Sequence, residues 1–296
     1  MNTETSTKPG TGGVTLHTIR WTPDAQPSTQ PTAEILLVHG YGEHSGRYEH
    51  VAQRLCDAGF AVTSLDHRGH GRSTGVERGT VDNFDLLVDD LASVVTDLSS
   101  GTSTACRCSS TAARWASLAT VRLAEARRDE RFAGLVITGP AHRRRRRACQ
   151  AVLADRQRTG GIAPNLPTVE LDGDAISRTP AVRADYDAGP CELLRRVTTG
   201  TARELSVAME ARHGPRPGRI TVPVLIMHGS DDTLADPRRS RCGSHLRSVP
   251  ATDGQHLTRL LPRTAQQARG ETACTLRSST GSTPAASTGP KHVPRR

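Results

Sequence analysis

The chain contains the short apolar run Glu34-Ile35-Leu36-Leu37-Val38, which is followed at once by His39-Gly40. A short apolar run that stops at a tight turn is typical of a buried parallel strand. The segment from Tyr48 to Gly59 has apolar residues at helical spacing and ends on glycine, which predicts a helix with a C-terminal stop. The run from Phe60 to Leu65 predicts a second strand. Together these elements form a βαβ unit.

The rest of the chain extends this pattern. The segment from Arg131 to Pro140 predicts another buried strand, after a helix that ends near Glu130. A chain of 296 residues is long enough for one large α/β domain that carries an inserted cap.

The composition is unfavourable for a large core and is uneven along the chain. Hydrophobic residues make up 35% and aromatic residues 3%, and after Tyr186 there is no Phe, Trp or Tyr. Aromatic side chains normally supply much of the buried area, so we expect poor order toward the C-terminus. The net charge is +9, with an unbroken arginine run from Arg143 to Arg147 and a tail rich in Arg, Ser, Thr and Pro from Arg238 onward. These basic segments predict solvated polypeptide; the alternative is a surface that binds nucleic acid or anionic lipid.

The N-terminal residues 1–13 are polar and have no apolar core of a signal peptide, and no later run reaches membrane-spanning length. We therefore expect a disordered start and a soluble, cytoplasmic protein. The seven cysteines include the close pair Cys106 and Cys108 but no second pair at a matching spacing. We expect free thiols, no metal site and no cofactor.

Two motifs carry a family resemblance. His39-Gly40-Tyr41-Gly42-Glu43-His44 and Asp66-His67-Arg68-Gly69-His70-Gly71-Arg72-Ser73 resemble the monoacylglycerol lipase and lysophospholipase branch of the α/β-hydrolases, a serine aminopeptidase-type hydrolase domain. The resemblance implies an α/β-hydrolase fold, with a mostly parallel sheet covered by helices on both faces. It also implies an oxyanion hole at Tyr41, through its backbone N–H, and at Gly40. For His39, His67 and His70 we favour a role in fixing these loops by hydrogen bonds over a role in chemistry.

The resemblance also covers later segments. A segment around Ile162 to Asp187 resembles the family's cap, and the strand-like run from Val222 to Met227 precedes His228-Gly229-Ser230-Asp231-Asp232. The family carries its triad acid at the position of Asp232; helix capping after a turn is the alternative role, and Asp231 would serve it equally well. The implied substrates are carboxylic esters of glycerol or lysophospholipids.

The family pattern breaks at the nucleophile. An α/β-hydrolase needs Gly-x-Ser-x-Gly on a sharp strand-to-helix turn, and the sequence contains no such motif. The turn should fall near Arg114, where the chain reads Ala113-Arg114-Trp115-Ala116, and the sequence shows no strand before it. The histidine position falls near Pro262. Neither the nearby serines nor the later histidines lie in a recognisable catalytic context: Ser109, Ser110, Ser117, His245 and His256.

A shifted reading frame accounts for both losses as a hypothesis. Trp is always encoded by TGG and Ala codons begin with GC, so reading Arg114-Trp115-Ala116 one base earlier forces glycine at the last codon and permits Ser-Met-Gly. A different frame from Leu260 to Ala268 permits a histidine segment like that of the family, with its histidine at the position of Pro262.

These observations predict a hydrolase-like domain over residues 14–240 with a cap at about 142–215, and a degenerate, disordered basic tail over residues 241–296. At most partial order, around residues 34–75, is expected. The function expected is that of a degenerate serine hydrolase that has lost its activity. A non-catalytic basic protein that contacts nucleic acid or anionic lipid is the alternative.

Overall fold

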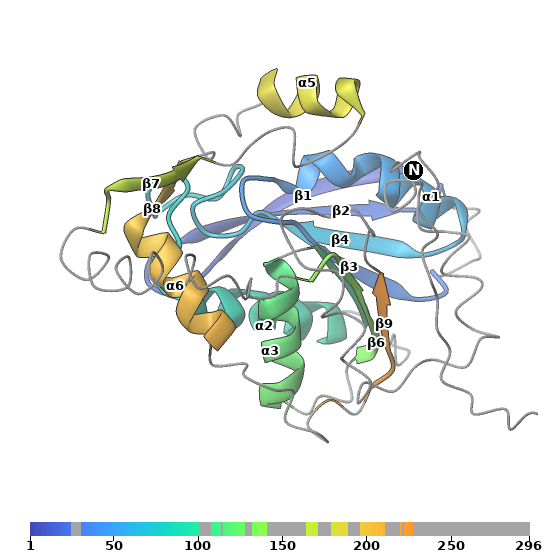
Figure 1. The fold of residues 1–296 in the computed structure, drawn as a ribbon. Helices are drawn as coiled ribbons and strands as arrows, with labels where there is room; N and C mark the ends of the chain where they lie inside the picture. Colours follow the sequence, from blue (N-terminus) through green and yellow to red (C-terminus); the bar gives the residue numbers. More distant parts are fainter. Residues whose placement is uncertain are drawn as a thin grey trace, which may run out of the picture.

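The computed structural model describes residues 1–24, 31–100, 108–113, 115–127, 132–140, 164–170, 179–188, 196–210, 220 and 222–227 (Figure 1). Their centre is a seven-stranded sheet with the strand order β1-β2-β4-β3-β5-β6-β9. The strands are β1 (Asn2–Pro9), β2 (Thr15–Thr22), β3 (Glu34–Val38), β4 (Ala61–Leu65), β5 (Cys108–Ala113), β6 (Phe132–Thr138) and β9 (Val224–Met227). The pairs β1–β2 and β2–β4 are antiparallel, and every later pair is parallel.

The predicted βαβ unit is confirmed. β3 and β4 pair in parallel, and the chain between them forms the 3₁₀ helix η1 (Ser45–Tyr48) and the helix α1 (Glu49–Asp57). Gly59 follows α1 with a φ of 89°, the left-handed conformation expected at a helix C-terminus. The predicted strand between Arg131 and Pro140 is also present as β6, and the run before His228 forms β9.

The expected disorder of residues 1–13 is wrong. Residues Asn2 to Pro9 form β1, which pairs with β2 along its whole length, from Asn2 opposite Thr22 to Pro9 opposite Thr15. β1 is an edge strand with little burial, so polar residues are compatible with it and main-chain pairing supplies its order. Lys8 also forms an ion pair with Asp97 on α2 (Phe84–Ser100).

The expectation of no strand before residue 114 is also wrong. Cys108 to Ala113 form β5, which lies between β3 and β6 and pairs in parallel with both. The segment Cys-Ser-Ser-Thr-Ala-Ala has no continuous apolar run, which hid the strand in the sequence. Partner strands on both sides supply hydrogen bonds that sequence pattern alone does not reveal, so position in the sheet outweighs propensity here.

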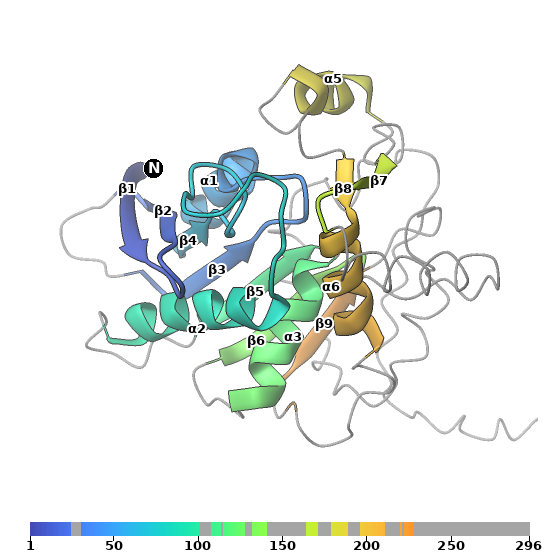
Figure 2. The ribbon, with the colours of Figure 1, turned by 90° about the vertical axis from the view of Figure 1, so that its left-hand side faces the viewer.

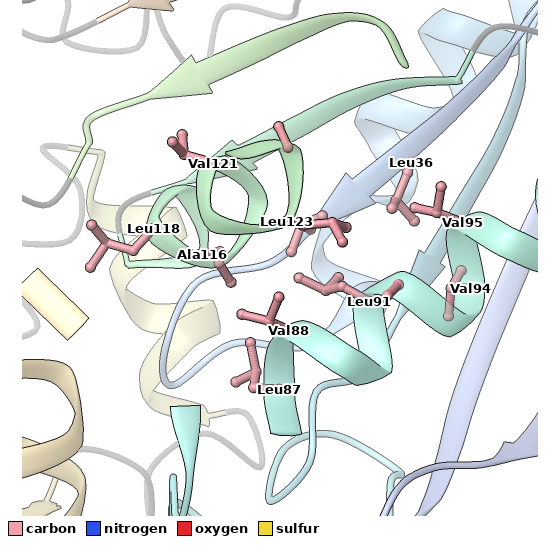
Figure 3. Close-up of a cluster of buried hydrophobic side chains, with 14 of the residues drawn as sticks. Leu36, Leu87, Val88, Leu91, Val94, Val95, Ala116, Leu118, Val121 and Leu123 are labelled. Carbon is pink, nitrogen blue, oxygen red and sulfur yellow. The ribbon is translucent and has the colours of Figure 1, made fainter. Parts of the chain in front are cut away.

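The core lies on both faces of the sheet. Ile35 and Leu37 of β3 face α1 and pack with Trp21, whereas Leu36 and Val38 belong to the larger cluster with α2 and α3 (Ala116–Arg127). Figure 3 shows how side chains of α2 and α3 meet in this larger cluster, among them Val88, Leu91 and Leu123. Each large side chain buried there contributes about 1.5 to 3 kcal/mol. Order therefore extends well beyond residues 34–75, because α2 and α3 cover a face that the shorter segment would leave exposed.

The proposed cap region contains described elements of its own. β7 (Pro167–Glu170) and β8 (Arg196–Thr198) form a two-stranded antiparallel sheet, and α6 (Thr199–Glu210) follows directly. The helix α5 (Pro180–Ala188) lies at the opposite end of the molecule from α3 in both views (Figures 1 and 2). Among the described residues, no helix is long and apolar enough to cross a membrane. The expected tail over residues 241–296 lies outside the described residues.

Candidate active site

The motifs follow strands that end at one edge of the sheet. β3, β4, β5, β6 and β9 are parallel, so their carboxyl ends lie together. The two motifs follow β3 and β4, and residue 114 falls between β5 and α3 in the sequence. Asp232 follows β9 in the sequence and lies outside the described residues. Ligands of open α/β sheets bind at this edge, which makes it the candidate active site.

His39 fixes the loop after β3. The backbone N–H of His67 donates to His39 Nε2 at 3.0 Å, so Nε2 is an acceptor and the ring proton lies on Nδ1. Nδ1–H then donates to the Gly40 carbonyl at 2.7 Å. Complete burial lowers the pKa of His39, against the opposing charge of Asp66, which favours this neutral tautomer. The expected role of His39 as a loop-fixing residue is therefore confirmed.

The same bond orients the proposed oxyanion donor. A peptide is planar and trans, so a Gly40 carbonyl that points toward His39 directs the N–H of Tyr41 the opposite way. The N–H of Gly40 donates to Glu43 Oε2 at 2.8 Å, so it is already engaged within the loop. The Gly40 N–H is thus engaged within the loop after β3 (residues 39–44, here named the oxyanion loop for its expected role), and the N–H of Tyr41 stays the expected oxyanion donor. The Gly-x-x-Glu spacing was the sequence signal for the Glu43 contact.

Asp66 ties the two motif loops together. Its Oδ1 accepts bonds from the N–H and the hydroxyl of Ser45, both at 2.7 Å, and its Oδ2 accepts the N–H of Arg72 at 2.8 Å. His17 Nδ1 lies 3.3 Å from Oδ2. Gly71 is required here, because its φ is 53° and a Cβ at this position would lie 2.2 Å from the Asp66 carboxyl group.

Arg68 anchors the second motif to the rest of the domain. Its Nε and Nη2 donate to the two carboxylate oxygens of Asp90 on α2, at 2.8 and 3.1 Å, and Nη2 also donates to the Thr11 carbonyl at 3.0 Å. Both charged side chains are only 1% exposed. His70 supports the same loop, since its Nδ1 donates to the Arg68 carbonyl at 3.0 Å. The fixing role expected of His70 is confirmed. For the His67 ring the same expectation is wrong, because neither of its buried ring nitrogens has a hydrogen-bond partner among the described residues, and His67 joins the loops through its backbone N–H.

The β5–α3 junction has the order strand, turn and helix that the family uses for its nucleophile. β5 ends at Ala113, Trp115 lies in a turn and α3 begins at Ala116; Arg114 itself lies outside the described residues. The Trp115 ring is 4% exposed and packs among Tyr41, His67, His70 and Phe84, with ring centroids 5.2 to 6.3 Å away. This packing could not be predicted from the sequence, in which a tryptophan beside the expected turn was the signal for it.

The remaining candidate residues lie within β5, in the first turn of α3 or outside the described residues. Ser109 and Ser110 lie within β5, opposite Ile35 and Leu36 of β3, and not at its carboxyl end. Ser117 is buried in the first turn of α3. The other candidates fall outside the described residues: Asp231, Asp232, Pro262, His245, His256 and the arginine run from Arg143 to Arg147.

Comparison with known proteins identifies the family. The family model described as serine aminopeptidase, S33 (Hydrolase_4), matches residues 29–258. The chain belongs to this family. As a member of the serine aminopeptidase S33 family, it is 35% identical over 232 residues to the monoacylglycerol lipase of Mycolicibacterium smegmatis, covering 78% of this chain and 80% of that protein. It is 30% identical over 217 residues to human monoglyceride lipase, covering 72% and 69% of the two chains.

Structural comparison agrees with the sequence relationship. The crystal structure of Paleococcus ferrophilus monoacylglycerol lipase superimposes with a TM-score of 0.67 at 25% identity, covering 85% of this chain and 99% of that one. The expected α/β-hydrolase fold and monoacylglycerol lipase-like family are thereby confirmed. These findings support a hydrolase lineage and do not support the alternative of a basic binding protein.

Proposed function

We propose that this chain is a monoacylglycerol lipase-type serine hydrolase by descent that has lost ester hydrolysis. The observation that carries the proposal is the β5–α3 junction, where the sequence reads Ala113-Arg114-Trp115-Ala116 in place of a glycine-flanked serine. The ancestral substrates would be carboxylic esters of glycerol or of lysophospholipids, as the names of the relatives suggest for the first class.

The chemistry explains why the change matters. Acyl transfer in this family requires a serine hydroxyl, a histidine that takes its proton, and a carboxylate that orients the imidazolium. A guanidinium such as that of Arg114 is always protonated and has no lone pair to attack a carbonyl. The family match also ends at residue 258, before the expected histidine position at Pro262. Loss of a triad nucleophile or base typically lowers turnover on the order of a millionfold.

Two parts of the ancestral machinery are proposed to remain. The N–H of Tyr41 would stabilise the oxyanion, since its peptide is oriented by His39, and such a donor is worth about 3 to 4 kcal/mol in an active enzyme. Asp232 would be the triad acid, because it has the family's position in the sequence after the strand β9. Neither group can form an acyl-enzyme without a nucleophile.

A fluorophosphonate probe tests the proposal on the purified chain, with the Mycolicibacterium smegmatis relative as the active control. We expect labelling of the control and none of this chain. Labelling that disappears in Ser109→Ala, Ser110→Ala or Ser117→Ala would identify a replacement nucleophile and contradict the proposal.

A shifted reading frame is the proposed origin of the broken segments. Two features of the sequence support this origin. A shift of one base requires a glycine codon at the position of Ala116, and a second shifted frame permits a family-like histidine segment near Pro262. Resequencing of the DNA over codons 101 to 116 and 241 to 270 decides whether the shifts are present in the gene. The cytoplasmic location stays a prediction, and cell fractionation would check it.

A further inference from the structure

The loop at residues 79–81 lies between the oxyanion loop and the cap region. The carbonyl of Gly79 accepts hydrogen bonds from two hydroxyl groups, Tyr41 at 2.8 Å and Thr201 of α6 at 3.3 Å. The hydroxyl oxygen of Thr201 also accepts the N–H of Val81 at 3.0 Å. A carbonyl oxygen has two lone pairs and can accept both donors at once. A single acceptor therefore joins α6 to the tyrosine of the oxyanion loop.

Thr201 is itself held firmly. It is 0% exposed, its hydroxyl oxygen accepts a bond from the Thr198 hydroxyl at 3.1 Å, and its N–H donates to Thr198 Oγ1 at 3.3 Å. On the next turn of α6, Glu204 Oε2 accepts the N–H of Phe84 at the start of α2, at 3.4 Å. α6 is thus attached to the hydrolase core at two successive turns, and displacement of α6 must strain both contacts.

Tyr41 connects this network to the β5–α3 junction. Its ring makes edge-on contacts with His70, at a centroid distance of 5.1 Å, and with Trp115, at 6.1 Å. Thr201 makes its hydrogen bonds with the loop and with Thr198, so the hydrogen-bonded route from Thr201 toward Trp115 runs through Gly79 and Tyr41. A second route, from Glu204 through Phe84 to Trp115, does not use the Tyr41 hydroxyl.

We propose that Thr201 is a positioning residue that sets the place of Tyr41, and with it the oxyanion loop, through the shared carbonyl of Gly79. The cap helix α6 and the oxyanion loop then move as one unit, so that whatever shifts α6 also shifts the proposed oxyanion donor. That Tyr41 is an oxyanion donor rests on the proposed function. The coupling between α6 and Tyr41 rests on the hydrogen bonds alone. An experiment that reports the position of the loop without measuring catalysis therefore tests the coupling separately from the proposed function.

Fluorine NMR of the full chain labelled with fluorotryptophan provides this readout. The chain has two tryptophans. Trp21 packs with Ile35, Leu37 and side chains of α1 on the other face of the sheet, so its resonance is an internal control. We expect Thr201→Val to move the Trp115 resonance and to leave the Trp21 resonance in place. In a Tyr41→Phe background the same substitution should move neither. Ser206→Ala is the matched control, because its hydroxyl bonds to Ala202 within α6, and it should leave both resonances unchanged.

Two further outcomes decide the proposal. Thr201→Ser keeps the hydroxyl and should restore the Trp115 resonance, whereas a purely steric role of the side chain would not be rescued. Coupling is reciprocal, so Tyr41→Phe should speed amide exchange in α6 by at least about fivefold. Tyr48→Phe, whose hydroxyl bonds to Glu43 in the same loop, should not. The proposal is overturned if Thr201→Val leaves Trp115 unmoved, or moves it equally with and without the Tyr41 hydroxyl.

Discussion

Removal of the buried guanidinium of Arg68 should destabilise the domain strongly. Arg68 and Asp90 are each 1% exposed, and Arg68 donates to both carboxylate oxygens of Asp90 and to the Thr11 carbonyl. Arg68→Met leaves a buried carboxylate without its counter-charge, a change that costs about 3 to 5 kcal/mol. That loss is a large fraction of the 5 to 15 kcal/mol that typically stabilises a domain.

The assay is urea denaturation followed by circular dichroism, with the free energy of unfolding taken from the midpoint and slope. Arg122→Met is the matched control, because Arg122 pairs with Asp85 between α3 and α2 but the two side chains are 34% and 66% exposed. Such a pair contributes about 0 to 1 kcal/mol. Replacing both buried partners, as Arg68→Met with Asp90→Leu, should recover much of the loss because no unpaired charge remains. Equal effects of Arg68→Met and Arg122→Met would refute the buried pair as a support of the fold.

Three further predictions address backbone strain, pH and catalysis. Gly71→Ala should destabilise the domain more than Gly12→Ala in the same urea assay, since both have positive φ but only the Cβ at 71 would meet a carboxyl group at 2.2 Å; equal losses would contradict this. Burial lowers the pKa of His67 well below 6.5 and that of His70 to about 3, so the unfolded chain binds more protons as pH falls below about 6.5. The free energy of unfolding should therefore decrease as the pH is lowered below about 6.5, by up to about 1.4 kcal/mol per pH unit for each histidine. An unfolding midpoint that is unchanged between pH 7 and pH 5 would argue against this prediction. Arg114→Ser alone should give no ester hydrolysis in a chromogenic ester assay, because no histidine base is restored; measurable turnover would show that another base is present.

The half of the fold with apolar strands could be predicted from the sequence. Glu34 to Val38 and Ala61 to Leu65 are buried on both faces of the sheet, so their apolar composition indicates a central position in the sheet. The strands β1 and β5 could not be found in this way. β1 is an exposed edge strand and β5 is built from small and polar residues, so both depend on main-chain pairing with strands distant in sequence.

The candidate site also has a part that the sequence predicted and a part that it did not. The motifs around His39 and Asp66 are local and predicted the two loops that the structure joins through His67 and Ser45. The contact of Thr201 with the loop at residues 79–81 joins segments about 120 residues apart, for which no sequence pattern exists. The residues at the strand ends could therefore be found from the single sequence, whereas Thr201 of α6 could not.

The most direct test of the account is ester hydrolysis by the purified chain beside a protein expressed from the same gene with both proposed frame shifts corrected. We expect turnover by the corrected protein and, for the present chain, a rate on the order of a millionfold lower. Comparable turnover by the two proteins would contradict the claim that this hydrolase scaffold has lost its nucleophile and its base.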